Sequence, residues 1–263
     1  MATSEEKEPV GIRSVRNALA IIRYLNALQE PAGVNSIAVE LGINVSSCFR
    51  LLKTLAAEGM LNFDQKSKTY TPAAGLVELA RSALQRPEIL ILREEILELA
   101  HKYDTTAMVM FPAGRERAII TDVVERDSPL RLKIDVGQEF PIFVGAFGRC
   151  FAAHSGMTKK ELRDHFESIE WDNAPPFDKY FRQVEQAKKD GYAIDHEDHL
   201  QGVLKVSACV RGSDGRPRFA LSIVALAAKF SKKECRQIGL DLKGRAGTLE
   251  SNAAFRSVVG VGG

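Results

Sequence analysis

The sequence predicts an α+β protein of two domains, in which an N-terminal winged helix-turn-helix is joined by a helical linker to a larger C-terminal α/β domain. Two short helical patterns separated by Gly42-Ile43-Asn44 have the spacing of a helix-turn-helix. A hairpin pattern with a lysine-bearing turn, 64–68, follows directly. Farther along the chain, strand patterns alternate with helical ones. We therefore expect domains at 11–72 and 88–263 and a linker at 73–87.

The N-terminal helices follow from hydrophobic periodicity and from capping residues. Apolar side chains recur at helical spacing over 14–28, which predicts a first helix. After a loop at 31–33, Asn35 is a candidate N-cap for a short second helix. Asn44 is a candidate N-cap for a third helix, which we expect to end near Glu58.

A β-hairpin is expected next. Residues 60–63 and 69–71 have strand-like composition and flank a polar turn that carries Lys66 and Lys68. A helix-turn-helix followed by such a hairpin is a winged helix.

The C-terminal elements are predicted from alternation, periodicity and turn residues. The expected helices cover 74–85, 88–103, 148–153, 159–166, 180–190 and 232–258. The expected strands cover 106–111, 118–125, 130–135, 203–211 and 218–226. Because the turn 212–215 joins the last two strands, we expect them to pair as a hairpin.

Length and composition exclude several classes of protein. The chain has 263 residues, of which 45% are hydrophobic and 27% charged, as in folded globular proteins. The longest apolar stretch of low charge, 219–228, is too short to cross a bilayer as a helix. The acidic N-terminus is unlike a secretory signal, so we expect a cytoplasmic protein with no membrane partner. The four cysteines lack any C-x-x-C spacing, which argues against a zinc ribbon or a disulfide framework.

The third helix is expected to have one apolar face and one polar face. At about 100° per residue, the side chains that cluster toward the core are Cys48, Leu51, Leu52 and Leu55. The opposite face carries Ser46, Arg50, Lys53 and Ala57, flanked by Ser47 and Thr54. Such a face can bind base edges and phosphates, although a solvated charged face would have the same pattern. Net charge is only +2, but 11–72 holds seven basic and four acidic residues, which together with the basic turn favours DNA contact.

Several short motifs, taken in order, resemble the IclR-type bacterial transcriptional regulators along nearly the whole chain. The resemblance rests on Ser14–Leu19, Asn44–Leu52, Gly59, Tyr70, Gly145–Ala153 and Asp195–Val203. Some positions depart from the family pattern, among them Asn44, where a Pro is often found. Asn17 stands where an Arg is usual and Arg149 where a Lys is usual. Val45 replaces a Lys or Asn, so we expect an apolar contact there, such as one with a thymine methyl group.

The resemblance implies a transcriptional regulator, most often a repressor, although the sign of regulation depends on where its operator lies. It implies no enzymatic activity and a GAF-like C-terminal domain that binds a small carboxylic acid. The expected DNA-contacting residues are Asn35, Ser36, Val45, Ser46, Ser47, Arg50, Lys53, Lys66 and Lys68. Because palindromic half-sites need symmetric proteins, we expect a homodimer on double-stranded operator DNA and a tetramer of paired dimers. Ile21 and Leu25 are candidates for the dimer contact.

The expected effector site combines a helix start with the faces of strands. The N–H groups of Ala146 and Phe147 can bind a carboxylate, although an ordinary glycine-assisted turn would look the same. Alternation places Lys205 on one strand face, and a buried ammonium group needs an anion, which an acidic effector would supply. Pairing of Lys205 with Asp195 or Glu197, or with solvent, is the alternative. With the positions added by the resemblance, the expected set is Leu132, Phe140, Ala146, Phe147, Asp195, Lys205, Ser222 and Val224. Such a pocket suits a small or aromatic carboxylate.

Two other functions remain open at this point. Residues 195–199 contain His and carboxylate side chains that a metal can bind, but His196 and His199 lack the spacing of the H-E-x-x-H motif. A hydrolase would need a nucleophile and a base brought together by the fold, and no G-x-S-x-G, P-loop or cofactor motif is present in the sequence. We expect no cofactor, no catalytic residue and no metal.

Overall fold

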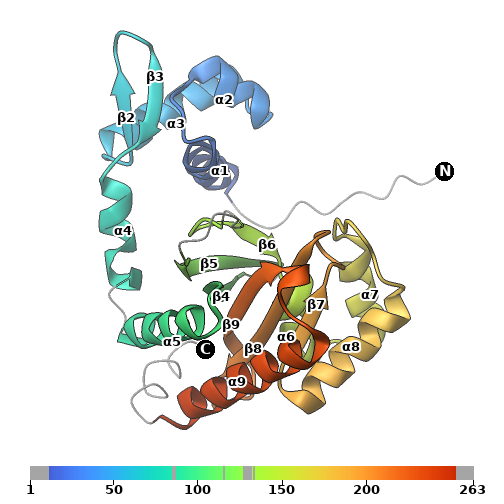
Figure 1. Cartoon of the computed structure of the whole chain (residues 1–263). Helices are drawn as coiled ribbons and strands as arrows, with labels where there is room; N and C mark the ends of the chain where they lie inside the picture. The colour runs from blue at the N-terminus through green and yellow to red at the C-terminus, as the bar shows by residue number, and fades with distance from the viewer. Residues whose placement is uncertain (1–11, 85–86, 115, 127–131, 133, 253–263) are drawn as a thin grey trace, which may run out of the picture. The chain divides into compact units, whose positions relative to one another are not determined.

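The computed structural model describes residues 12–84, 87–114, 116–126, 132 and 134–252. The chain divides into two compact units, Met1–Arg86 and Pro87–Gly263 (Figure 1). Each unit has hydrophobic core residues of its own. Helices and strands occur in both units, which confirms the predicted α+β class.

The N-terminal unit packs helices against a small antiparallel sheet. Its helices are α1 (Arg13–Leu28), α2 (Val34–Glu40), α3 (Val45–Ala57) and α4 (Gly75–Leu84). Its strands are β1 (Ala32–Gly33), β2 (Leu61–Asp64) and β3 (Thr69–Pro72), arranged in the order β1-β3-β2. The core that these elements enclose includes Ile21, Leu25, Ile37, Leu52 and Tyr70. The helix-turn-helix and its hairpin are therefore confirmed.

The start of α3 forms as predicted, but the start of α2 does not. Asn44 caps α3, and its side-chain oxygen accepts a hydrogen bond of 3.0 Å from the N–H of Ser46. The predicted N-cap Asn35 is wrong, because α2 already begins at Val34 and Gly33 is its N-cap. Gly33 belongs to β1, is extended and pairs with Thr69 of β3, so most of the segment predicted as a loop is a short strand.

The exposed side of α1 also differs from the prediction. Ile21 and Leu25 are fully buried inside their own unit, so the expectation that they contribute to a dimer contact is wrong. Val15 and Leu19, two apolar residues of the same helical pattern, are exposed.

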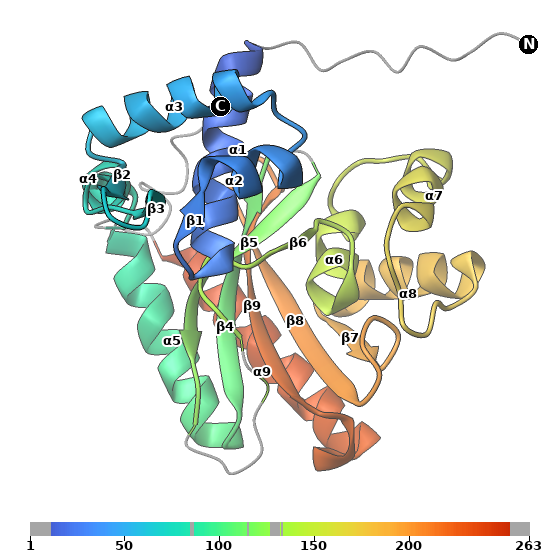
Figure 2. The ribbon, with the colours of Figure 1, turned by 90° about the horizontal axis from the view of Figure 1, so that it is seen from above.

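The C-terminal unit is built on one sheet of six strands within the described residues, in the order β6-β5-β4-β9-β8-β7. Its strands are β4 (Thr106–Ala113), β5 (Arg117–Val124), β6 (Glu139–Pro141), β7 (Ala193–His196), β8 (Val203–Arg211) and β9 (Pro217–Leu226). Its helices are α5 (Pro87–Tyr103), α6 (Gly145–Ala153), α7 (Lys159–Glu167), α8 (Phe177–Asp190), the 3-10 helix η1 (Ala227–Lys229) and α9 (Lys232–Ser251). Helices α5 and α9 cover one face of the sheet, and α6, α7 and α8 cover the other (Figure 2).

Some predicted elements of this unit need correction. In the expected strand 130–135, residues 132, 134 and 135 are not in a strand, and the rest of it lies outside the described residues. Strands β6 and β7 were not predicted, because they are only three and four residues long and show no clear alternation. Helix α6 begins at Gly145, three residues before the prediction, whereas the end of the last predicted helix, 253–258, lies outside the described residues.

Strand β8 lies between the two helical layers and matches its predicted range. Leu204, Val206, Ala208 and Val210 belong to the core beneath α5 and α9, whereas Val203 and Cys209 belong to the core beneath α6. The predicted alternation is therefore confirmed, and it places Lys205 on the face toward α6. In the described part of the chain, no helix is both long and apolar enough to cross a membrane.

Candidate functional site

The first candidate surface is the exposed side of α3. Cys48, Leu52 and Leu55 are buried in the core, as the periodicity predicts. The five predicted DNA-contacting residues of this helix are all exposed: Val45, Ser46, Ser47, Arg50 and Lys53. Hydroxyl groups and cations are thus presented together on one helical face, which is the chemistry that base edges and phosphates require.

The hairpin and α2 add further polar groups to the N-terminal unit. Lys66 and Lys68 are exposed in the turn between β2 and β3, and the N–H of Lys66 donates a 2.7 Å hydrogen bond to Asp64, which fixes the turn. Asn35 and Ser36 are exposed near the start of α2. All nine side chains that the sequence assigned to DNA contact are therefore accessible.

A groove of about 460 Å³ lies between α1 and α3 and includes residues that the sequence analysis missed. Arg13 and Asn17 of α1 line it opposite Ser47, Arg50 and Thr54 of α3. Their part in this groove could not be inferred from periodicity, because it depends on how the two helices cross.

The second candidate site lies on the sheet face under α6, where neighbouring strands bring the predicted effector residues into two rows. Asp195 of β7 pairs with Lys205 of β8, which in turn pairs with Val224 of β9. In the next row Ser222 pairs with Ser207, and their hydroxyl oxygens are 2.7 Å apart. Residues separated by up to 29 positions in the sequence thus meet on one surface.

The start of α6 lies beside these rows, and glycines shape its backbone at positions 145 and 148. Gly145 has a left-handed φ of 69°, and a Cβ built on it would lie 3.4 Å from Asp195 Oδ2 and 3.9 Å from Lys205 Nζ. A Cβ at position 148 would lie 2.1 Å from the carbonyl carbon of Phe143, so only glycine fits there. The N-cap residue Val144 makes no side-chain hydrogen bond to the first turn. The helix start therefore faces both a carboxylate and an ammonium group.

Lys205 and Asp195 are buried with their polar groups incompletely paired. Lys205 is 8% exposed, and its Nζ donates to Nδ1 of His199 at 2.5 Å. Asp195 Oδ1 accepts the N–H groups of Asp198 and His199 at 3.0 and 3.4 Å. Its Oδ2 is buried and, within the described residues, has no hydrogen-bond partner. An unsatisfied buried carboxylate oxygen is unfavourable, so this position suits a donor group or an ordered water.

Burial sets the protonation of the pair formed by His199 and Lys205. Burial, with the nearby Lys205 charge second, lowers the pKa of His199 to about 4, so the ring is neutral at pH 7 and its Nδ1 can accept a hydrogen bond. Burial also lowers the pKa of Lys205 to about 8, with Asp195 opposing the shift. Lys205 is therefore still mostly an ammonium group at pH 7.

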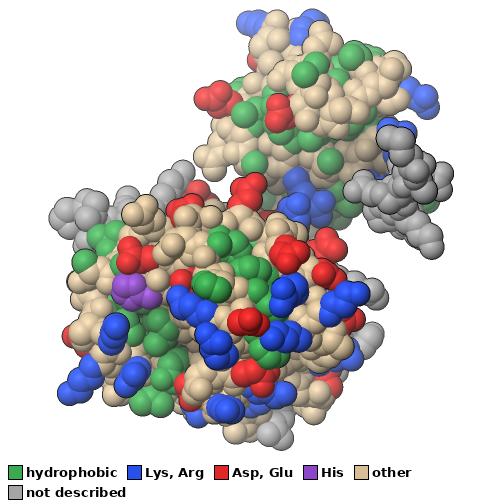
Figure 3. Space-filling model, turned by 90° about the vertical axis from the view of Figure 1, so that its right-hand side faces the viewer, with side chains coloured by type: hydrophobic (Ala, Val, Ile, Leu, Met, Phe, Trp, Pro, Cys, Tyr) green, Lys and Arg blue, Asp and Glu red, His purple; other side chains and the backbone are tan. Residues whose placement is uncertain are grey.

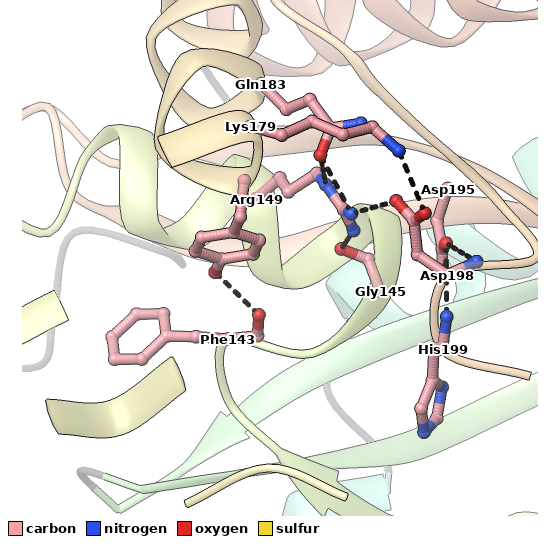
Figure 4. A network of polar contacts seen from close by, with 9 residues as sticks. Phe143, Gly145, Arg149, Lys179, Gln183, Asp195, Asp198 and His199 are labelled. Carbon is pink, nitrogen blue, oxygen red and sulfur yellow. Dashed lines mark hydrogen bonds and ion pairs between the residues drawn. The ribbon is translucent and has the colours of Figure 1, made fainter. Parts of the chain in front are cut away.

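Arg149, one helical turn along α6, anchors a polar network that the sequence analysis missed (Figure 4). Its side chain is fully buried and forms a 2.7 Å ion pair with Asp198, which also contacts Lys179 at 3.3 Å. It donates two hydrogen bonds, of 3.1 and 3.0 Å, to Gln183 and one of 2.8 Å to the Gly145 carbonyl. Charge and hydrogen bonds thus hold the start of α6 against the loop after β7. The replacement of the family's usual Lys by Arg149 was the only signal in the sequence.

Most of the predicted effector residues are closed to solvent, and among the described residues the set does not line a single cavity. Ala146, Phe147, Asp195 and Ser222 are each less than 4% exposed. Phe140 lines a neighbouring cavity of about 590 Å³, and its ring centroid is 6.4 Å from that of Phe147. Leu132 and Val224 line another cavity, of about 350 Å³.

Residues 195–199 show no arrangement for a metal. Asp198 pairs with Arg149, His199 binds Lys205, and His196 points to Glu197 at 3.4 Å. Across the residues that the structure describes, no group of three or more His, Cys, Asp or Glu side chains could hold a metal ion. The metal alternative therefore gains no support.

The surface of the C-terminal unit differs from the face of α3. On the side shown in Figure 3, basic and acidic side chains are interspersed over this unit. Such a mixed surface on this side lacks the single-sign field that steers a protein to DNA. The features for DNA contact described above all belong to the N-terminal unit.

An exposed recognition helix with a basic wing, joined to a separate α/β unit, is typical of DNA-binding transcriptional regulators. Residues 14–65 match the IclR helix-turn-helix domain, and residues 81–249 match the bacterial transcriptional regulator IclR C-terminal domain. The chain belongs to the IclR family of bacterial transcriptional regulators.

Known proteins of this family are similar over most of the chain. The HTH-type transcriptional repressor AllR of Escherichia coli K12 is 21% identical over 234 residues, which cover 86% of each protein. An IclR transcriptional regulator from Alicyclobacillus acidocaldarius matches with a TM-score of 0.81 and 22% identity, covering 92% of this chain and 99% of that one. An IclR homologue from Microbacterium hydrocarbonoxydans, complexed with 4-hydroxybenzoate, has a TM-score of 0.70 and 14% identity, covering 95% of this chain and 100% of that one.

Family membership settles the broad function. The chain is a DNA-binding transcriptional regulator, as its motifs predicted. The relatives are regulators and not enzymes, so the hydrolase alternative is set aside.

Proposed function

We propose that this regulator is a cytoplasmic repressor whose affinity for its operator is changed by a small carboxylic acid. Residues 11–72 bind double-stranded operator DNA, 73–87 link the domains, and 88–263 bind the effector and assemble the chain. The protein acts as a homodimer and as a tetramer of paired dimers. A repressor is supported by AllR, which carries that name. Two-fold symmetry is supported by the geometry of helix-turn-helix proteins, which place one recognition helix in each half-site.

The DNA contacts are proposed from the exposed face of α3 and the wing. Arg50 and Lys53 supply charge, and their neighbours Ser46 and Ser47 supply hydroxyl groups at the same face. Wing lysines, together with the exposed start of α2, contact phosphates and fix the register without reading the sequence.

The observation that carries the effector proposal is the buried Lys205 beside the start of α6. Its ammonium group is buried beside His199, and within the described residues it forms no ion pair with Asp195. A carboxylate would bind Lys205 and the N–H groups of Ala146 and Phe147 together. If the effector also carries a hydroxyl group, this group can donate to Oδ2 of Asp195.

The walls of the proposed pocket favour an aromatic effector. Phe140 and Leu132 lie next to this part of the core, and Ser222 and Val224 complete the sheet side. The homologue complexed with 4-hydroxybenzoate supports this class, because that ligand combines a carboxylate, a ring and a hydroxyl group. Since the site is closed, the effector has to shift side chains on entry, and such a shift can change the balance between domain arrangements.

A thermal-shift screen of the full chain tests the effector proposal. The probes are benzoate, 4-hydroxybenzoate and 4-hydroxybenzamide, the last of which keeps the shape but lacks the charge. A ligand at 100 times its Kd stabilises the native state by about 2.7 kcal/mol. We expect the acids to raise Tm, the amide to have a much smaller effect, and Lys205→Met to abolish the shift.

The matched control is Lys189→Met, which removes an exposed lysine of the same unit. Because Lys205 has a pKa of about 8, the stabilisation by the acids should also weaken as the pH rises above 8. An undiminished shift in Lys205→Met would place the acid elsewhere and overturn the proposed site.

A further inference from the structure

The exposed face of α3 carries one aromatic side chain that its pattern of hydroxyls and cations leaves unexplained. Phe49 is 45% exposed. Within the described residues it neither belongs to the core of the N-terminal unit nor packs against that core. A single exposed phenylalanine is common on protein surfaces, so exposure alone says little. The position of this ring makes it informative, because it borders the side chains proposed to contact DNA.

Phe49 forms a strip with residues one helical turn before and after it. Val45, four residues earlier, is 48% exposed, and Lys53 is four residues later. The Nζ atom of Lys53 lies 5.6 Å from the centroid of the Phe49 ring, within the range of a cation–π contact. The ring therefore also positions a cation that the proposed function uses.

The chemistry of such a strip matches one feature of the DNA major groove. Thymine alone among the four bases presents a methyl group there, and apolar side chains recognise it by contact. A phenylalanine beside a lysine can pack on this methyl group while the ammonium group binds a neighbouring phosphate or base acceptor. We propose that Phe49 is a specificity-determining residue that reads a thymine methyl group in the operator. This inference rests on the proposed DNA contact of α3.

The wing offers a matched comparison for this residue. Phe63 of β2 is 41% exposed, and Lys68 Nζ lies 5.9 Å from its ring centroid. The two aromatic rings thus have similar exposure and a similar cation above them. Phe63 lies in the wing, which is proposed to contact phosphates, and phosphates carry no direct sequence information. Phe63→Ala should therefore weaken binding equally for all sequences.

The test uses the full-length protein and a duplex that the wild type itself selects from a random library. The selected duplex is then made in two forms, one with thymine and one with uracil at every thymine position, which removes only the methyl groups. The Kd of each form is measured at one fixed salt concentration for the wild type, Phe49→Ala and Phe63→Ala. Loss of one contacted methyl group should weaken wild-type binding about fourfold, the effect of returning one such group to water.

We expect the ratio of the uracil to the thymine Kd to be about four or more for the wild type and Phe63→Ala, and about fourfold lower for Phe49→Ala. A ratio of one for the wild type overturns the inference without any variant, so it stays testable even if Phe49→Ala folds poorly. If Phe49→Ala has the same Kd ratio as the wild type, the inference is overturned too. If the oligomeric state of this variant also changes, the ring belongs to a contact between copies of the chain. Failure to select any duplex would instead contradict the proposed DNA binding.

Discussion

Replacement of Arg149 by methionine should strongly destabilise the C-terminal unit. The variant keeps an unbranched apolar stem but leaves Asp198 buried without its main partner. Gln183 also loses two donors, and the Gly145 carbonyl loses one. Removing one partner of a buried ion pair costs about 3–5 kcal/mol. Because Lys179 stays 3.3 Å from Asp198, we expect the lower end of that range, about 3 kcal/mol.

The single tryptophan provides a local assay for this unit. Trp171 lies 5.8 Å from the Arg149 guanidinium carbon, so its fluorescence during urea unfolding reports on the C-terminal unit within the full chain. The matched control is Arg182→Met, an exposed arginine of α8, which should change stability by no more than about 0.5 kcal/mol. If Arg149→Met stays within about 1 kcal/mol of this control, our reasoning on the network is refuted.

Two further predictions concern DNA binding and acid stability. Arg50→Ala should weaken operator binding by about 1–3 kcal/mol at fixed salt. The control Arg81→Ala removes an exposed arginine of α4 and should leave binding unchanged. Equal losses of binding in the two variants would exclude Arg50 as a DNA anchor. Because the pKa of His199 is lowered to about 4, the unfolded chain binds its proton at a higher pH than the native chain does. Stability should therefore decrease from pH 6.5 to pH 5, and this histidine contributes about 1–2 kcal/mol of the loss. Urea unfolding followed by Trp171 at both pH values should show a smaller decrease in His199→Gln, and identical decreases would show that His199 does not titrate as described.

Strong local signals predicted most of the fold. The Asn44 cap and the alternation along β8 each depend on a few neighbouring residues, and both are present as predicted. Strand β1 could not be predicted, because a strand of two residues is too short to show an alternating pattern. Its pairing with β3 is also a long-range contact, which local sequence does not reveal. Residues 132, 134 and 135 of the predicted strand 130–135 show the opposite error. Alternating residues there resemble a strand, but the position next to β5 is taken by β6.

The candidate sites were predictable to different degrees. The exposed face of α3 follows from helix geometry once its buried face is known. Phe49 escaped notice because an aromatic residue is normally assigned to the core. The network of Arg149 and Asp198 joins residues 49 positions apart in the chain. All nine residues of α6 are buried, so the helix has no contrast between an apolar and a polar face. Its periodicity therefore could not show that Arg149 is buried.

The alternation along β8 also has an evolutionary consequence. Odd-numbered positions from 203 to 209 face the proposed ligand side, and even-numbered positions from 204 to 210 face α5 and α9. Substitutions at the odd-numbered positions can therefore change the proposed ligand preference. The even-numbered positions, which pack against α5 and α9, can stay unaltered. Under the proposed function, a single strand would let descendants of one gene bind different acids while the supporting layer is kept.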